Sequence, residues 1–490
     1  MGTVAALVVY ALLLAGAGAI VWRRPLIALY LFVIGLAAHN AVMAGLYAAG
    51  LHGAALTAVT AWKEVLLGVA LVRVGTDAIR ARELPFRPGA VDALALAFAA
   101  LVVVYALIPQ SVLGGEAGRK AVALGARHDL VPVGAFFLGR SLRLGAAELR
   151  RLAWTLLGVA AAVAGIGLVD AYAVPISWWR GNGVVDYFRK HLGYDYHGTG
   201  GLPENFIYNV GGDKPFLRRL VSTFLSPLAS GYLFVVALVV AAAGLRRWAA
   251  IAVSAVVAAG LLFTFSRSSL LALAAGLVVL GLIRRRPVWI AVGVATVGLA
   301  VAWTHVFPKI GPTGRFTQAD LRYQHRQARE HPGASGSATS GNEPSIHSHL
   351  TSLRDGFRTM VDHPQGYGLG NVGQTASRTG TPLKAGESNY TELGVELGVL
   401  GAVLWTAWGL ATLARLVRVG LRDRWAAGVA AAFAAILLLA VQTDVIGDPW
   451  VAYCVWALAG SLVAAPRPVG RERGERVDLE WRGLERVAGS

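Results

Sequence analysis

Apolar residues occur along the chain in blocks of about twenty, separated by short breaks that contain arginine. A helix of that length crosses a hydrocarbon core roughly 30 Å thick, because each helical residue adds about 1.5 Å. The pattern therefore predicts an all-α polytopic membrane protein with about 12–13 transmembrane helices. The thirteen predicted spans are residues 2–22, 25–49, 54–74, 89–108, 128–143, 151–172, 224–244, 249–265, 268–283, 287–305, 391–414, 425–444 and 449–465.

The arginine-rich breaks all fall on one side of the predicted bundle. Together with the segment after Pro466 they hold 25 of the 45 basic residues. Because basic residues beside spans mark the cytoplasmic side, we expect the N-terminus outside and the C-terminus inside. The first segment is expected to be a true span and not a cleaved signal, since further spans follow it directly.

Two segments, 173–223 and 306–390, are too long and polar to be ordinary connections, and the predicted threading places both outside. The first carries an amphipathic stretch rich in Trp and Tyr at 176–196, which is expected to lie along the membrane interface. The second combines a Gly/Ser stretch at 333–345 with a helix-like segment from His347 to Val361.

The predicted division of the chain follows from these spans and loops. It comprises N-terminal transmembrane helices (1–172), an extracytoplasmic interfacial loop (173–223), central transmembrane helices (224–305), a large extracytoplasmic loop (306–390), C-terminal transmembrane helices (391–465) and a cytoplasmic tail (466–490).

Composition excludes several classes of protein. Hydrophobic residues make up 56% of the chain and charged residues 15%, whereas a soluble domain carries roughly 25% charged residues. Most of the net charge of +17 comes from basic residues beside the spans, which set the orientation in the membrane. We therefore expect a lipid bilayer and no nucleic acid as partner. Cys454 is the one cysteine, which excludes a disulfide framework and a cysteine metal site.

Cationic residues stand at the predicted outer ends of two spans. Arg218 and Arg219 lead into the seventh span, and Arg267 lies in the short turn between the eighth and ninth. A guanidinium matches phosphate oxygens two at a time, so a lipid diphosphate is a candidate ligand. Serines on both sides of Arg267 supply further donors. The alternative is that these arginines are interfacial anchors.

The second outer loop carries further candidate binding residues. Arg354 and Arg358 are one helical turn apart and face the same way. The glycine-rich segment around Tyr367 permits close approach of the backbone to a ligand. These three residues are expected to bind substrate.

Glu387 lies immediately before the eleventh span, close to Asn389, which is a further substrate-binding candidate. Partial desolvation there would make the Glu387 carboxylate a usable base. The alternative is a helix-capping acid.

The loop histidines do not predict a metal site. His347 and His349 are two residues apart, a spacing that separates them on a helix, and the sequence has neither a His-Glu-x-x-His motif nor an Asp-x-Asp pair. We expect a solvated polar loop for most of these histidines, including His325, His331 and His363, and chemistry without metal or cofactor.

The segments RRLVSTFLSP, TFSRSSLLAL, RDGFRTMVDHPQGYGLG and GESNYTELGVELGVLG, in this order, resemble the O-antigen ligase and O-antigen polymerase superfamily of bacterial membrane glycosyltransferases. WKEVLLG at residues 62–68 is similar too. The distinctive motifs cover residues 216–402. The resemblance implies a GT-C-type enzyme without metal. It would use an undecaprenyl diphosphate-linked oligosaccharide as donor and a glycan acceptor, on the outer face of the inner membrane.

The resemblance also implies roles for individual residues. Arg219 and Arg267 would hold the diphosphate, and Arg354 opens the segment that ends in the glycine-rich motif. Glu387 stands where family ligases carry a histidine proposed to activate the acceptor, which favours a polymerase or a ligase with another acceptor. The implied reaction is an inverting displacement with Glu387 as base and the arginines stabilising the leaving diphosphate.

Two other functions stay open at this point. A transporter or flippase of polyprenyl-linked or anionic substrates would use polar residues within spans, and Lys63 and Glu64 are adjacent charges in the third span. Alternatively, these charges pair with a neighbouring helix. A scaffold in an envelope assembly would show no cationic pocket at the membrane.

Overall fold

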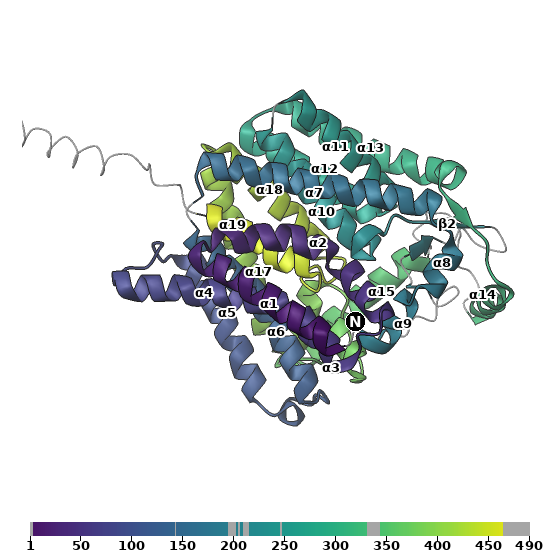
Figure 1. Ribbon diagram of the computed structural model, residues 1–490, viewed down its shortest axis with the longest axis horizontal. Helices are drawn as coiled ribbons and strands as arrows, with labels where there is room; N and C mark the ends of the chain where they lie inside the picture. Colours follow the sequence, from purple (N-terminus) through teal and green to yellow (C-terminus); the bar gives the residue numbers. More distant parts are fainter. Residues whose placement is uncertain are drawn as a thin grey trace, which may run out of the picture.

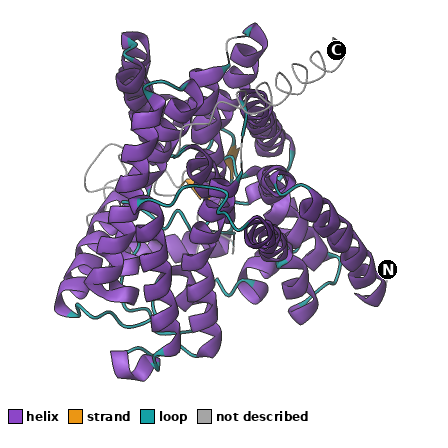
Figure 2. Cartoon of the chain, turned by 90° about the vertical axis from the view of Figure 1, so that its left-hand side faces the viewer, coloured by secondary structure: helices purple, strands orange, loops and turns teal. Residues whose placement is uncertain are grey.

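The computed structural model describes residues 3–142, 144–194, 202–203, 206–208, 215–245, 247–330 and 344–463. Helices make up nearly all of it (Figure 2). Ten helical segments among the described residues are long and apolar enough to cross a membrane. They are α1 (Thr3–Arg23), α2 (Leu26–Ala48), α3 with α4 (Gly53–Thr60, Trp62–Ala81), α5 (Ala90–Leu107), α6 (Arg119–Ser141), α7 (Ala146–Ala173), α10 (Pro227–Gly244), α12 (Arg267–Arg284), α13 (Pro287–Ile310) and α17 (Asn389–Gly420).

Three shorter apolar helical segments complete the set: α11 (Trp248–Phe263), α18 (Arg424–Leu439) and the segment formed by η6 and α19 (Val451–Val455, Trp456–Leu462). Each of the thirteen predicted spans coincides with one of these segments, so the prediction of an all-α polytopic membrane protein is confirmed. The predicted tail 466–490 lies outside the described residues, as do His331 and most of the Gly/Ser stretch.

The largest deviation from the predicted boundaries is α6, which begins at Arg119 and not near residue 128. Its first half contains basic and acidic side chains that lower its hydropathy. One face of this half is nevertheless packed, because Gly125 lies against the backbone of Gly370, where an added Cβ would come within 2.9 Å of Gly370 N. Burial among neighbours therefore extends the helix further than the hydropathy pattern indicates.

The helices pack closely through small residues. An added Cβ at Gly139 would lie 2.0 Å from Ala457 O, and one at Gly260 would lie 2.5 Å from Ala164 Cβ. Small residues allow such approach between helices in a membrane. In Figure 1, α7, α11, α12 and α13 run side by side, and α10 and α18 pack against them. Aromatic rings also fill the core, with Trp408 stacked on Trp456 at a centroid distance of 4.1 Å.

Short elements gather at one end of the bundle, on the right of Figure 1, which we call the capped end. They are α8 (Ile176–Gly181), α9 (Val184–Asp186), η2 (Tyr187–His191), β1 (Ile207–Tyr208), β2 (Phe216–Arg218), β3 (Thr313–Gly314), α14 (Gln318–Glu330), α15 (Pro344–Asp362) and α16 (Gly373–Thr379). The short turns η1 (Gln110–Leu113) and η5 (Ser222–Phe224) connect the helices around them. The predicted helix at 347–361 is therefore present as part of α15.

A small antiparallel sheet with the order β1-β2-β3 was not predicted. Ile207 pairs with Arg218 and Phe216 pairs with Gly314. The sheet joins the two long polar segments, since β1 and β2 belong to the first and β3 to the second. It fixes where Arg218 and the following arginine point.

The glycine-rich segment after α15 packs against a break in α17. Gly398 has φ +72°, which interrupts the helix, and the amide of Tyr367 donates to Val395 O (2.7 Å). An added Cβ at Gly368 would lie 1.8 Å from Gln110 Oε1. The sequence predicted that these glycines allow approach to a ligand, whereas in the structure they allow approach to other parts of the protein.

Candidate active site

The turn between α11 and α12 places Arg267 at the capped end. Ser266 is the N-cap of α12, and its Oγ accepts a hydrogen bond from Ser269 N. Phe265 adopts a left-handed conformation with φ +49°, which completes the tight turn. Arg267 is thus the first residue of α12, half-buried, as the predicted short turn requires. The Ser266 hydroxyl therefore acts as a helix cap, and it also lies 2.8 Å from Ser269 Oγ.

Arg219 approaches the same turn from the strand side. Its Nε donates to Thr264 O (2.8 Å), a carbonyl at the C-terminal end of α11. The amide of Leu220 donates to Phe263 O (2.9 Å) beside it. Burial and the nearby positive charge of Arg267 lower the pKa of Arg219 to about 10, so the side chain stays a cation at neutral pH. The structure therefore brings two of the predicted catalytic residues together at one turn.

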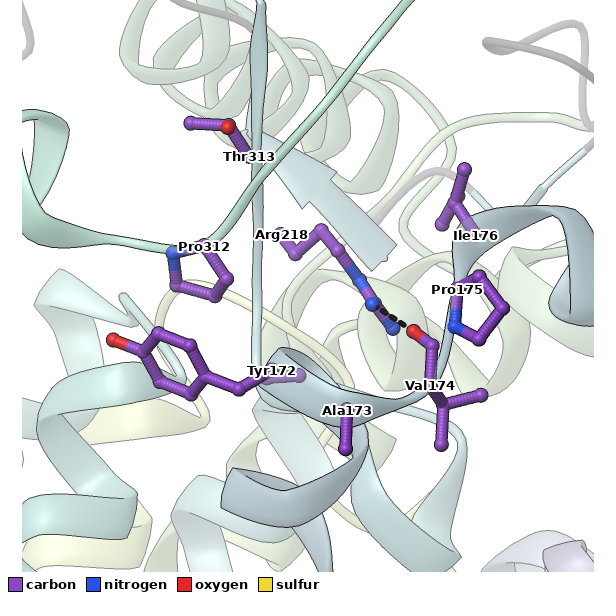
Figure 3. Close-up of a pocket in the computed structure, with 9 residues that line it drawn as sticks. Tyr172, Ala173, Val174, Pro175, Ile176, Arg218, Pro312 and Thr313 are labelled. Atoms are coloured by element: carbon purple, nitrogen blue, oxygen red, sulfur yellow. Dashed lines mark hydrogen bonds between the residues drawn. The ribbon is translucent and has the colours of Figure 1, made fainter.

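Arg218 points to the other face of β2. It lines a cavity of about 460 Å³ together with Tyr172, Pro312 and Thr313 (Figure 3). Its guanidinium donates to Val174 O and lies 3.5 Å from Asp170 Oδ1. Burial lowers the pKa of Arg218, while the Asp170 carboxylate acts in the opposite direction. The side chains of Arg218 and Arg219 thus lie in two different environments, because successive side chains along a strand point to opposite faces.

Glu387 contacts a histidine of α15. His349 Nδ1 lies 2.7 Å from Glu387 Oε1, and both side chains are about one-third exposed. Glu387 Oε2 has no hydrogen-bond partner among the described residues. The contact exists because α15 packs on α17, where an added Cβ at Gly356 would come within 2.8 Å of Thr391 Cβ. One carboxylate oxygen therefore lies beside a histidine, and the other is a buried acceptor with no hydrogen-bond partner among the described residues.

The other predicted binding residues of this region occupy the surface of the capped end. Arg354 and Arg358 are exposed on α15, and Arg358 Nε lies 3.5 Å from Asp362 Oδ2. Tyr367 stacks on His363 with a centroid distance of 4.0 Å, and Lys384 lies over its ring at 5.4 Å. No hydrogen bond or ion pair between described residues joins this region to the turn that carries Arg267.

Asn389 has a structural role in the fold. It is fully buried; its Nδ2 donates to Asp444 Oδ1 (2.5 Å), and its Oδ1 accepts from Val445 N (2.9 Å). The Asn389 amide ties the start of α17 to the loop that follows α18. Each end of the amide thus makes one bond within the protein, and the contact of Asn389 with substrate stays a prediction.

The same loop belongs to a buried polar network that the sequence reading missed. His128 of α6 lies between two carboxylates, with Nδ1 2.8 Å from Asp129 Oδ1 and Nε2 3.0 Å from Asp444 Oδ2. Burial would raise the pKa of Asp444, but the charge and hydrogen bond of His128 outweigh it, and the pKa lies below its usual value. Polar residues within apolar helices signalled this network.

Glu392 and Glu396 were a further sign of buried polar contacts, because they are acidic residues within the apolar helix α17. Glu396 Oε1 accepts from Gly370 N (2.8 Å), so it holds the glycine-rich segment against the helix. Among the described residues, no group of three or more His, Cys, Asp or Glu side chains is arranged to hold a metal ion.

Comparison with known proteins finds one family match. No curated protein matches the chain. The O-antigen ligase family model matches residues 252–406, a region that contains Arg267, α15, the glycine-rich segment and Glu387. The described residues thus include ten helices long and apolar enough to span a membrane, and the chain is a polytopic membrane protein with a region similar to the O-antigen ligase family.

Proposed function

We propose that the protein is a membrane glycosyltransferase that moves a glycan from an undecaprenyl diphosphate-linked donor to a sugar hydroxyl of an acceptor, as an oligosaccharide polymerase or ligase. The observation that carries the proposal is the pair of arginines at the α11–α12 turn. Two guanidinium groups at a helix end of a membrane protein suit a diphosphate head group, because each can bind phosphate oxygens in a planar fork.

The arginines act on the leaving group. The acceptor oxygen attacks the anomeric carbon, and the bond from that carbon to the diphosphate oxygen breaks with its electron pair. Arg219 and Arg267 neutralise the charge that grows on the diphosphate. Donors placed in advance toward such a charge are often the largest single contribution to catalysis. The displacement inverts the anomeric configuration and needs no metal ion.

Glu387 takes the proton of the attacking hydroxyl. Its Oε2 is the acceptor atom, while His349 on the other side positions Oε1. A carboxylate base contributes typically 10²–10⁴-fold to such a step. His349 is a positioning residue in this proposal, since it acts through Glu387. Arg354 and Arg358, exposed on α15, and Tyr367 are proposed to contact the glycan.

The proposed location is the bacterial inner membrane, with the capped end outside. Arg23 is the last residue of α1. Arg284 is the last residue of α12 and is followed by Arg285 and Arg286, whereas Arg267 lies at the other end of α12, which is at the capped end. Basic residues beside spans favour the cytoplasm, which places the capped end on the opposite side. The two long polar segments would then be extracytoplasmic loops.

Release of undecaprenyl diphosphate from a glycan-loaded donor, measured with the reconstituted full chain and an acceptor, tests the role of the arginines. Arg267→Gln should slow release by about 10²-fold, the effect of removing one preorganised donor. Arg326→Gln, an exposed arginine of α14, is the charge-matched control and should keep the wild-type rate. Wild-type release by Arg267→Gln would contradict the proposal.

A further inference from the structure

The outward face of α15 carries large apolar side chains. Leu350, Phe357 and Val361 are 60%, 58% and 55% exposed. Because they are seven and four residues apart, they lie along one line of the helix, which we call the α15 stripe. Arg354 lies on the same line and Arg358 beside it, and both are exposed. Exposed apolar side chains next to arginines are typical of a surface that contacts a partner or a membrane.

The opposite face of α15 packs on the first part of α17. An added Cβ at Gly356 would lie 2.8 Å from Thr391 Cβ, and one at Gly394 would lie 2.2 Å from Met360 Sδ. Every residue of α17 in the range 391–398 is buried. At this level α15, and not α17, therefore forms the outer surface of the bundle.

The outer surface passes from α15 to α17 at the break in α17. Directly after Gly398, which interrupts the helix, Val399 and Val403 are exposed. The exposed Pro364, three residues after Val361, accepts a hydrogen bond from Val399 N (2.9 Å). Because α17 is long and apolar enough to cross the membrane, its exposed apolar side chains face lipid. The α15 stripe thus continues the lipid-facing surface of a span.

The length of α17 indicates how far the hydrocarbon layer extends. From Val399 to the exposed Arg415 the helix rises about 24 Å, at 1.5 Å per residue. A hydrocarbon core is roughly 30 Å thick, and an exposed arginine is favoured at its edge or beyond it. The apolar layer therefore extends past Val399 to the level of the α15 stripe.

We propose that α15 is an interfacial helix, whose stripe lies in the lipid leaflet at the capped end and whose Arg354 and Arg358 lie at the level of the lipid phosphates. The partner of this face is the lipid surface itself. Amphipathic helices at an interface bury their apolar face about 5–10 Å into the boundary between head groups and acyl chains. The apolar side chains of the stripe suit the acyl chains, and the guanidinium groups suit phosphate oxygens.

Contact of α15 with the membrane has a consequence for the reaction, and this consequence alone rests on the proposed function. His349 of α15 lies 2.7 Å from Glu387, measured from Nδ1 to Oε1. A helix anchored in the leaflet holds this pair close to the layer that contains the diphosphate of a lipid-linked donor. Arg354 and Arg358 then meet the glycan while it is still attached to its lipid.

Fluorescence quenching in the full chain tests the lipid contact. Cys454 is buried, so a thiol-reactive fluorophore labels only an introduced cysteine. Phe357→Cys places the label on the stripe. Asp355→Cys, exposed on the same helix but turned about 160° away, is the matched control. In nanodiscs whose lipids carry a nitroxide on the acyl chain, the label of Phe357→Cys should be quenched several-fold more than that of Asp355→Cys, and iodide in the water should quench them in the reverse order.

Val361→Cys repeats the measurement at a second position of the stripe, and Val399→Cys gives the quenching of a side chain that faces lipid. If iodide quenches both stripe labels as strongly as that of Asp355→Cys, the stripe faces water and the proposal is overturned. Stripe labels that are protected from both quenchers would also overturn it, because another polypeptide would then cover the stripe. The assay contains no glycan, so a failure of glycan transfer would contradict the proposed function and leave the lipid contact standing.

Discussion

Two histidine–carboxylate contacts, one at His128 and one at Glu387, differ in which of their polar atoms have protein partners. His128 has a carboxylate at each ring nitrogen, and its partner Asp444 also accepts from Asn389. Glu387 has a histidine at one oxygen and no hydrogen-bond partner at the other. In the first arrangement both ring nitrogens of the histidine have partners, and the contact stabilises the fold, whereas the second retains an acceptor for chemistry.

The comparison shows that burial and charge alone do not identify a catalytic group. The more buried network has the larger electrostatic effects, but both ring nitrogens of His128 and both oxygens of Asp444 have protein partners. Glu387 is only partly buried, and its Oε2 has no hydrogen-bond partner among the described residues. Removing a partner should therefore affect stability in the first case and turnover in the second.

The largest effect is expected from Glu387→Gln, which keeps the shape of the side chain and removes the base. Glycan transfer should fall about 10³-fold, while the thermal unfolding temperature stays within error of wild type because Oε2 makes no hydrogen bond to any residue that the structure describes. Glu83→Gln, an exposed glutamate, is the matched control. Transfer at the wild-type rate by Glu387→Gln would remove Glu387 from the reaction.

Asp444→Asn should act mainly on stability. Removing one partner of a buried charge pair costs about 3 kcal/mol, since the His128 imidazole keeps Asp129 and loses its second carboxylate. The free energy of unfolding in detergent measures the effect, with the exposed Asp77→Asn as control. A fully stable Asp444→Asn that has lost transfer would reverse the assignment of the two contacts.

A smaller effect is expected at His349. His349→Ala should slow transfer about tenfold because Glu387 loses the group that positions Oε1. His349→Gln, whose side-chain amide can donate to Oε1, should restore most of the rate. Equal losses in both variants would indicate that the imidazole itself takes the proton, a result that kcat for the two purified proteins would show.

The smallest effect is expected from the titration of Asp448, which lies in the same loop as Asp444 and affects the free energy of unfolding. Burial raises the pKa of Asp448 to about 7 in the folded protein. Because the unfolded carboxyl ionises near pH 3.9, its contribution to stability is present at low pH and is lost as pH rises through 7. Between pH 6 and pH 8 the free energy of unfolding should fall by about 1 kcal/mol. Asp448→Asn should show no such fall.

The span pattern and the Arg267 turn were predictable because both depend on local sequence. Hydropathy marks each apolar helix, and a serine before Arg267 caps α12 as serines commonly do. The all-α class followed from the same pattern. The small sheet β1-β2-β3 could not be predicted from it, because its strands have only two or three residues each.

The contacts that define the two histidine sites could not be predicted, because each depends on tertiary packing. His128 and Asp444 are 316 residues apart. His349 meets Glu387 only because Gly356 lets α15 lie against α17. The sequence predicts a solvated polar loop for most of the loop histidines and a substrate contact for Asn389, and no local pattern indicates the neighbours that His349 and Asn389 have in the fold.

The most direct test reconstitutes the full chain with an undecaprenyl diphosphate-linked oligosaccharide and resolves the lipid-linked products by size. We expect products longer than the starting glycolipid, a ladder for a polymerase or one added unit on a supplied acceptor for a ligase, and their loss in Glu387→Gln and Arg267→Gln. Unchanged glycolipid that has crossed the vesicle bilayer, with no glycan transferred, would contradict the account and indicate a transporter.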